Sequence, residues 1–256
     1  MKAQTVSPLK HEPARLPGQS VDEEIGRVVD RFLSERMAIV TMFVVIAIYD
    51  WIRWYTDTPI NPYLTSALAA VAAAWFVYGY MRTRTSLTRL KLGRDGERAV
   101  GMLLERARTL GYHVLHDIPS HNANIDHVIV GPGGVFTIET KTYSKPLHGG
   151  CVIHYNAAKN TLHKGSHDIS SCLVQAKAQA GELRFLMEEY SCTNVPIQPV
   201  VVFPGWFIQC TERTPGEVWV LEPKAFLKWI EKVPTALAPD QINATRQILS
   251  RHVLEK

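Results

Sequence analysis

The segment NIDHVIVGPGGVFTIETK, residues 124–141, decides the fold of this chain. It contains two runs rich in β-branched residues, 125–130 and 135–140, joined by the glycine-rich turn 131–134. Such runs are typical of strands, and a short turn with several glycines connects neighbouring antiparallel strands. The sequence therefore predicts a β-hairpin over 125–140.

Helices and further strands are predicted on both sides of this hairpin. Apolar residues at helical spacing predict a helix from about 94 to 110, which Gly111 ends. Further strands are predicted at 112–117, 151–155, 197–203 and 218–221, and further helices at 171–190, 223–230 and 239–254. This order predicts an α/β fold with a mixed sheet flanked by helices.

The apolar residues of the chain are concentrated before this domain. Residues 63–81 are nineteen positions without a charge, close to what a helix needs to cross about 30 Å of hydrocarbon. Residues 37–55 form a second apolar stretch, which Asp50 interrupts near its end, where a charge costs less than at mid-bilayer. The sequence predicts a two-helix transmembrane hairpin over 37–81, with a buried core helix as the alternative for 63–81.

Basic residues indicate which side of the membrane the termini occupy. Between Tyr49, where the uninterrupted apolar run of the first stretch stops, and residue 63, Arg53 is the single basic residue, whereas both outer flanks are basic. The flanking residues are Arg27, Arg31, Arg36, Arg82, Arg84, Arg89, Lys91 and Arg94. The positive-inside rule places such flanks in the cytoplasm. We therefore expect a protein of the inner (cytoplasmic) membrane, with the lipid bilayer as a partner and both termini cytoplasmic.

Three charged residues of the predicted β-hairpin form a candidate site. Asp126 lies on one strand, and Glu139 and Lys141 share one face of the other because strand side chains alternate. Adjacent carboxylates repel one another unless a cation joins them, and oxygen ligands of this kind suit Mg²⁺ or Mn²⁺. A solvent-facing acid and lysine two positions apart are also commonplace. The apolar strand before them and Asp126 opposite favour a functional site.

Three motifs resemble the nuclease-related domain (NERD) family, a branch of the PD-(D/E)XK nuclease superfamily. They are Gly93-x-x-Gly96-Glu97, the segment 125–134 (IDHVIVGPGG), and Val135-Phe136-x-Ile138-Glu139-x-Lys141. The resemblance is strong over about fifty residues and continues weakly to about residue 205. Ile125 stands where the superfamily has a proline before the aspartate. The resemblance implies a restriction-endonuclease-like mixed sheet.

The same resemblance implies a role for each site residue. Asp126 and Glu139 would bind Mg²⁺ or Mn²⁺, Glu97 would extend the acidic cluster, and Lys141 would be the catalytic lysine. Gln175 matches a glutamine that often lies near such sites. Glu97 also lies where a helix dipole favours an acidic residue, so helix capping is an alternative for it.

The expected activity is hydrolysis of phosphodiester bonds, with nucleic acid, DNA by preference, as the substrate. A non-catalytic membrane-tethered module that binds nucleic acid or a protein is the alternative. The net charge of +4 permits a nucleic-acid partner without requiring one. The expected division is a tail and amphipathic helix (1–36), the transmembrane hairpin (37–81), a basic linker (82–92), the NERD nuclease-like domain (93–210), and a C-terminal strand and helices packing on it (211–256).

Overall fold

The computed structural model of the chain describes residues 15–57, 62–120, 124–146, 150–190, 192, 195–211 and 216–255. The chain divides into two compact units. One unit is Val21–Lys91, and the other joins Leu92–Lys256 to the described residues before Val21. The first unit consists of helices, and the second is a mixed α/β fold with two sheets.

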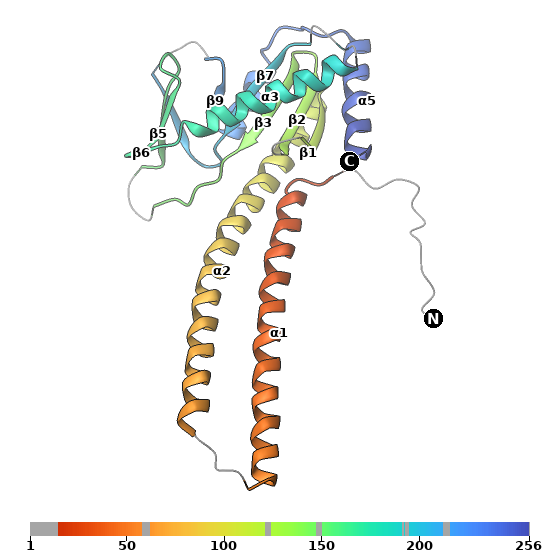
Figure 1. Cartoon of the computed structure of the whole chain (residues 1–256). Coiled ribbons are helices and arrows are strands. Elements are labelled where there is room, and N and C mark those ends of the chain that lie inside the picture. Colours follow the sequence, from red (N-terminus) through yellow and green to blue (C-terminus); the bar gives the residue numbers. More distant parts are fainter. Residues whose placement is uncertain are drawn as a thin grey trace, which may run out of the picture. The chain divides into compact units, whose positions relative to one another are not determined.

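A five-stranded sheet forms the centre of the α/β unit (Figure 1). Its order is β1 (His113–Ile118), β2 (Ile125–Gly131), β3 (Gly134–Thr140), β7 (Ile197–Val202) and β9 (Trp219–Leu221). The first three strands pair antiparallel, and β3, β7 and β9 pair parallel. The predicted hairpin is confirmed, with Gly131 opposite Gly134 across the turn.

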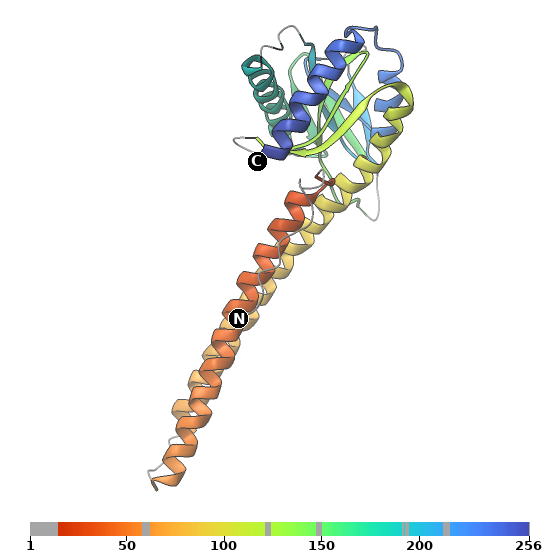
Figure 2. The ribbon, with the colours of Figure 1, turned by 90° about the vertical axis from the view of Figure 1, so that its right-hand side faces the viewer.

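Helices cover both faces of this sheet because the central strands are apolar on both sides. Val128 and Val130 of β2 face the layer that contains α3 (Ser171–Glu189) and α5 (Pro239–Glu255). Ile129 packs in the opposite layer with the end of α2 (Pro62–Leu104), the 3₁₀ helix η1 (Glu105–Leu110) and α4 (Pro223–Ile230). In Figure 2, α5 passes across the sheet beside β1 and β2. Alternate residues of each strand therefore belong to different cores.

A second sheet of four strands packs beside the first. Its order is β6 (His167–Asp168), β5 (Thr161–Lys164), β4 (Val152–Asn156) and β8 (Phe207–Cys210). Of these strands, β4 is the one that the sequence predicts. The others are short and partly exposed, so they lack the apolar run that makes a strand recognisable in a sequence.

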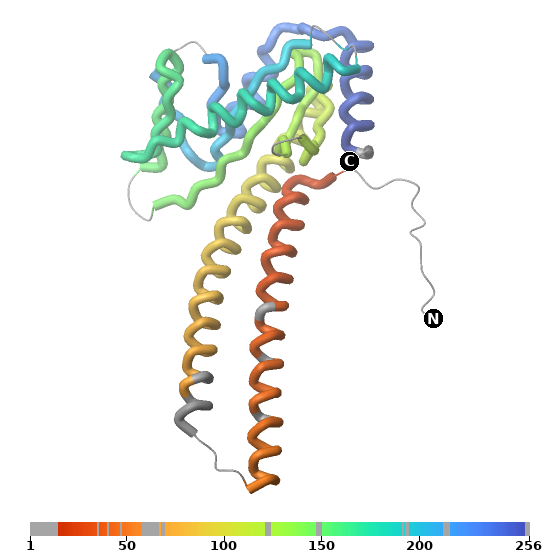
Figure 3. Tube along the Cα trace, in the orientation of Figure 1, coloured from red at the N-terminus to blue at the C-terminus, as the bar shows by residue number. Residues whose placement is uncertain are grey.

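Two long helices make up the unit of Val21–Lys91. Helix α1 runs from Gln19 to Tyr55 and α2 from Pro62 to Leu104, each without a break (Figure 3). The expected division into an amphipathic helix at 21–36 and a separate span is therefore not observed. The expected linker at 82–92 is likewise part of α2. Neither junction contains a proline or glycine, so nothing in the local sequence interrupts the helix.

Helix α1 is long and apolar enough to cross a membrane, by length and composition. No part of its apolar window is buried, which distinguishes it from a core helix. Because signal sequences near an N-terminus have the same composition, α1 does not by itself establish an anchor. The predicted second span, 63–81, includes positions whose side chains lie outside the described residues, and it stays a prediction.

Candidate functional site

The carboxylates of Asp126 and Glu139 lie on neighbouring strands and on the same face of the sheet. His127 of β2 pairs with Ile138 of β3, so the next pair of residues is Asp126 and Glu139. The backbone N–H of Thr140 donates to Asp126 Oδ2 over 2.7 Å. The side chain of Glu139 is 2% exposed, and that of Asp126 is half-buried. The two carboxylates therefore meet at a largely buried position at the carboxyl end of β3.

Lys141 and two glutamines of α3 surround Glu139. Lys141 Nζ lies 2.5 Å from Glu139 Oε1 and donates to Gln175 Oε1 over 2.9 Å. Gln179 Nε2 donates to Glu139 Oε2 over 2.6 Å. Gln175 and Gln179 are four positions apart, so they share one face of α3. The helix thus fixes both the carboxylate and the ammonium group from the same side.

Glu97 reaches this cluster from α2, at a point where the helix comes very close to the residue after Lys141. Gly96 is buried, and a Cβ there would lie 2.7 Å from Thr142 Cβ and still closer to Thr142 Oγ1. The negative charge of Glu139 and the positive charge of Lys141 both act on the pKa of Glu97. The glycine before Glu97 in the first motif is therefore required by the close approach of the helix.

Substituting this glycine is expected to destabilise the protein. Gly96→Ala would force the helix and Thr142 apart, which typically costs about 1–3 kcal/mol. Gly93→Ala is the matched control, because no atom apart from its chain neighbours and the backbone of its own helix lies within 4 Å of the Cβ that it would add. That change is expected to be neutral or to stabilise the helix by about 0.5–1 kcal/mol. Thermal unfolding of both variants checks this, and equal melting temperatures would rule out the close contact.

The carboxylates of the cluster hold on to protons more strongly than isolated ones. Burial raises the pKa of Asp126 well above its ordinary value, and the charges of Glu139 and Glu97 raise it further. Burial, Asp117 and Glu139 raise the pKa of Glu97 to about 7. Burial alone would lower the pKa of Lys141, but Glu139 and Asp126 outweigh it, and the net shift is upward. The site therefore combines a lysine that stays protonated with carboxylates that repel one another.

The raised pKa of Glu97 predicts a pH-dependent effect of Glu97→Gln. In the metal-free protein the unfolded chain ionises Glu97 near pH 4.5 and the folded chain near pH 7. Ionisation therefore opposes folding, and this penalty grows between these values and is complete above them. At pH 8 in EDTA, Glu97→Gln is expected to be the more stable protein by on the order of 1–3 kcal/mol.

At pH 4, where Glu97 is mostly protonated in both states, the two proteins should have nearly the same stability. Acid also destabilises the folded protein through His127, because burial lowers the pKa of this residue to about 3. The stability of each protein at pH 4 is therefore compared with that of the other, and not with its own value at pH 8. Since His127 is present in both proteins, its contribution cancels in the difference. A difference in melting temperature that does not change with pH would contradict the raised pKa of Glu97.

The arrangement of the side chains in the cluster determines whether it can bind a metal ion. Within the part of the chain that the structure describes, no three or more His, Cys, Asp or Glu side chains form a group that could hold a metal ion. Both oxygens of Glu139 already accept N–H donors, from Lys141 and Gln179. Each carboxylate oxygen keeps a second lone pair, so these bonds do not exclude a ligand role.

The structure adds two residues that the sequence interpretation omits. Gln179 is 3% exposed and binds Glu139, and its spacing of four from Gln175 is the signal that could have identified it. Asp117, the next-to-last residue of β1, has a φ of 50°, and its charge raises the pKa of Glu97. Its carboxylate accepts hydrogen bonds from Arg15 and Asn124 over 3.0 and 2.9 Å. No local motif marks Asp117, because its contacts are distant in the sequence.

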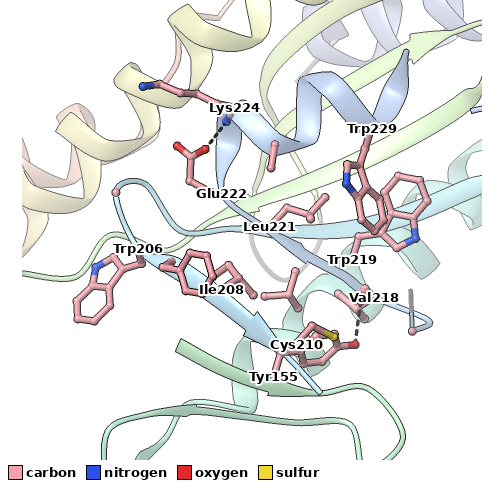
Figure 4. Close-up of a pocket in the computed structure, with 15 residues that line it drawn as sticks. Tyr155, Trp206, Ile208, Cys210, Val218, Trp219, Leu221, Glu222, Lys224 and Trp229 are labelled. Carbon is pink, nitrogen blue, oxygen red and sulfur yellow. Dashed lines mark hydrogen bonds between the residues drawn. The ribbon is translucent and has the colours of Figure 1, made fainter. Parts of the chain in front are cut away.

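A cavity of about 630 Å³ lies at the edges of the two sheets, between β8 and β9 (Figure 4). Its walls are aromatic: Trp219 and Trp229 lie edge to face with ring centroids 5.4 Å apart. Trp206 also lines it and donates from Nε1 to the carbonyl of Tyr143 over 3.2 Å. None of the five predicted site residues lines this cavity, so it is separate from the carboxylate cluster.

Comparisons with known proteins relate the segment that contains the carboxylate cluster to a protein family. Residues 92–204 match the family model described as NERD, nuclease-related domain, which is less than half of the chain. An uncharacterized protein of Bacillus anthracis is 32% identical over 62 residues, which are 22% of this chain and 29% of that protein. The chain thus spans less than a third of that relative. No solved structure matches the chain. The family match supports a nuclease-related domain at residues 92–204.

Proposed function

We propose that this protein is a membrane-anchored, metal-dependent nuclease that hydrolyses phosphodiester bonds, with DNA as its preferred substrate. The observation that carries the proposal is the position of Lys141. Its ammonium group lies 2.5 Å from the buried Glu139 and within electrostatic range of Asp126 and Glu97. The match of residues 92–204 to the nuclease-related domain supports the same chemistry.

The donor set of the cluster fits a hard divalent cation. Asp126, Glu139 and Glu97 offer carboxylate oxygens, which are the ligands that Mg²⁺ and Mn²⁺ prefer. Burial and, after it, the charges of neighbouring carboxylates raise the pKa values of Asp126 and Glu97. A bound cation would relieve the repulsion among these carboxylates. We propose these three residues as its ligands. When bound, the ion supplies a water activated for attack and positive charge for the phosphate oxygens.

The residues of the chain supply the rest of the mechanism. Lys141 presents a permanent positive charge to the phosphate, where negative charge grows in the transition state. Gln175 accepts a hydrogen bond from the ammonium group and Gln179 donates one to Glu139, so α3 fixes the positions of both charged groups. The N–H of Thr140 fixes the orientation of Asp126. These contacts are formed before substrate binds, so little reorganisation is needed during the reaction.

A cleavage assay on the purified full chain in detergent tests this proposal. Single- and double-stranded DNA and RNA would each be incubated with Mg²⁺, Mn²⁺ or EDTA. The expected result is cleavage that requires the divalent ion and is fastest on DNA. Faster cleavage of RNA would correct the substrate and leave the mechanism standing. Cleavage that persists in EDTA would overturn the role of the metal.

A second candidate function is a membrane-tethered module that binds nucleic acid without cleaving it. It is favoured by the engagement of both Glu139 oxygens and by the lack of a preformed metal group among the described residues. The same assay distinguishes the two functions. Binding of DNA by the full chain with no cleavage under any divalent ion would establish the second.

Membrane anchoring is the part of the proposal that rests on the helices. We propose that α1 and the apolar part of α2 form a transmembrane hairpin with both termini in the cytoplasm. Reporter fusions after residues 57 and 92 are then expected to report opposite sides of the membrane. Both fusions reporting the same side would contradict the hairpin.

A further inference from the structure

A pocket between α1 and α2, within the unit of Val21–Lys91, is lined by three arginines. Its volume is about 440 Å³. Arg31 and Arg36 come from α1, and Arg82 comes from α2. Thr83 and Ser86 also line the pocket. Guanidinium and hydroxyl groups from two helices therefore surround one space, and all of them can donate hydrogen bonds.

Aromatic rings fix the side chain of Arg36 in this pocket. Its guanidinium carbon lies 3.9 Å from the ring centroid of Phe32, 4.6 Å from that of Phe76 and 5.8 Å from that of Tyr80. Rings that stack on a planar guanidinium cover its faces and leave its N–H groups to donate in the plane. Arg36 Nε is buried and has no hydrogen-bond partner among the described residues. This donor is thus positioned for an acceptor that the described chain does not provide.

The charge of the pocket is not balanced by the described part of the chain. No described carboxylate forms an ion pair with Arg31, Arg36 or Arg82. A guanidinium group does not lose its proton in proteins, so these charges persist at any physiological pH. Arg31 and Arg82 are exposed, whereas Arg36 is half-buried, and a partly buried charge without a counter-charge is costly. The pocket therefore favours an anion from outside the chain.

The arginines lie at one defined level of the apolar segments. Arg36 directly precedes the apolar stretch that begins at Met37, and Arg82 directly follows the one that ends at Met81. The pocket brings these two boundaries together. Trp75 and Tyr78 also line it, and such side chains gather where hydrocarbon meets headgroups. In an inserted hairpin this level coincides with the lipid phosphates.

We propose that this pocket binds the phosphate of an anionic phospholipid headgroup. Arg36 donates from its fixed guanidinium, Arg31 and Arg82 neutralise the charge, and Thr83 and Ser86 donate from their hydroxyls. A zwitterionic headgroup leaves more of the positive charge unbalanced, so the pocket discriminates in favour of an anionic lipid. The inference rests on the proposed membrane anchoring and is independent of nuclease activity.

The test uses the full chain in detergent micelles that contain phosphatidylglycerol or phosphatidylcholine, with inorganic phosphate as a third arm. Binding is followed by the rise in melting temperature on titration and by native mass spectrometry of retained lipid. The pocket variant is Arg36→Gln with Arg82→Gln. Its matched control is Arg27→Gln with Arg84→Gln, since both are exposed residues of the same two helices and do not line the pocket. A third variant, Arg82→Gln alone, removes one charge from the pocket and leaves the stacking of Arg36 on the aromatic rings intact.

Phosphatidylglycerol is expected to bind the wild type and the control pair alike, within about twofold. The pocket variant should bind it at least about tenfold more weakly, and Arg82→Gln alone should also weaken it. Equal binding by the two double variants overturns the site. Equal stabilisation by phosphatidylcholine or by inorganic phosphate overturns the anionic lipid as its ligand. Membrane fractionation of the expressed chain separates these results from failure of the anchor, which would leave the chain in the soluble fraction.

Discussion

Lys141→Ala is expected to lower the rate of phosphodiester cleavage by about 10²–10³-fold. The ammonium group of Lys141 lies 2.5 Å from Glu139 and is held by Gln175, so it is preorganised beside the proposed metal ligands. An interaction that strengthens only in the transition state acts on kcat and not on substrate binding. Affinity for DNA should therefore fall only modestly, because one cationic contact is a small part of the total.

The structure also predicts a loss of stability for this variant. The sequence alone suggests that a lysine at the end of a strand contributes little to folding. Because Glu139 is 2% exposed, removing Lys141 leaves a buried carboxylate without its charge partner. Breaking a buried pair in this way typically costs about 3–5 kcal/mol. The melting temperature of Lys141→Ala without metal should therefore fall clearly below that of the wild type.

Two further variants separate the catalytic effect from the structural one. Lys141→Arg keeps the positive charge beside Glu139, so it should recover most of the stability while remaining slow, since its planar group cannot occupy the same point. Lys159→Ala removes one exposed lysine elsewhere and should leave both properties unchanged. If Lys141→Ala cleaves as fast as the wild type at a temperature where both are folded, the proposed mechanism is wrong.

The centre of the site follows from the sequence because it depends on local rules. A short turn fixes the register of β2 and β3, and alternation then places Glu139 and Lys141 on the face of Asp126. The same rules predict the hairpin and the apolar strand β7. Glu97 and Gln175 lie on other elements, and the resemblance to a family is what points to them. Their positions against the hairpin could not be obtained from spacing.

Features that depend on tertiary contacts do not follow from the sequence. Asp117 is brought toward Glu97 by the path of β1, and Arg15 bonds to it from more than a hundred positions away. The helices also extend further than their hydropathy suggests, for a different reason. The change from polar to apolar residues near Met37 and again near Arg82 suggests separate elements, but hydropathy does not interrupt backbone hydrogen bonding. Helices α1 and α2 therefore continue through both positions.

Asp126→Asn is expected to abolish metal binding and, with it, metal-dependent cleavage. Loss of a residue that only supports a metal ligand already costs about 10–100-fold in metal affinity, so loss of a direct ligand should cost more. Asparagine has the same shape, and its carbonyl oxygen can still accept the hydrogen bond from the N–H of Thr140. Calorimetric titration with Mn²⁺ should show binding by the wild type and none by the variant. Asp240→Asn, at an exposed position of α5, is the control for charge.

The stability of the same variant should change in the opposite direction from its activity. Burial, Glu139 and Glu97 raise the pKa of Asp126, so its ionised form opposes folding when no cation is present. At pH 8 in EDTA, Asp126→Asn should therefore melt at a higher temperature than the wild type. Added Mn²⁺ should raise the melting temperature of the wild type, because an ion that binds only the folded state stabilises it, and should leave the variant unchanged. If the variant melts at a higher temperature but still binds Mn²⁺ as the wild type does, Asp126 is not a ligand. If the metal is held by carboxylates, the variant should be folded and should have lost both Mn²⁺ binding and cleavage.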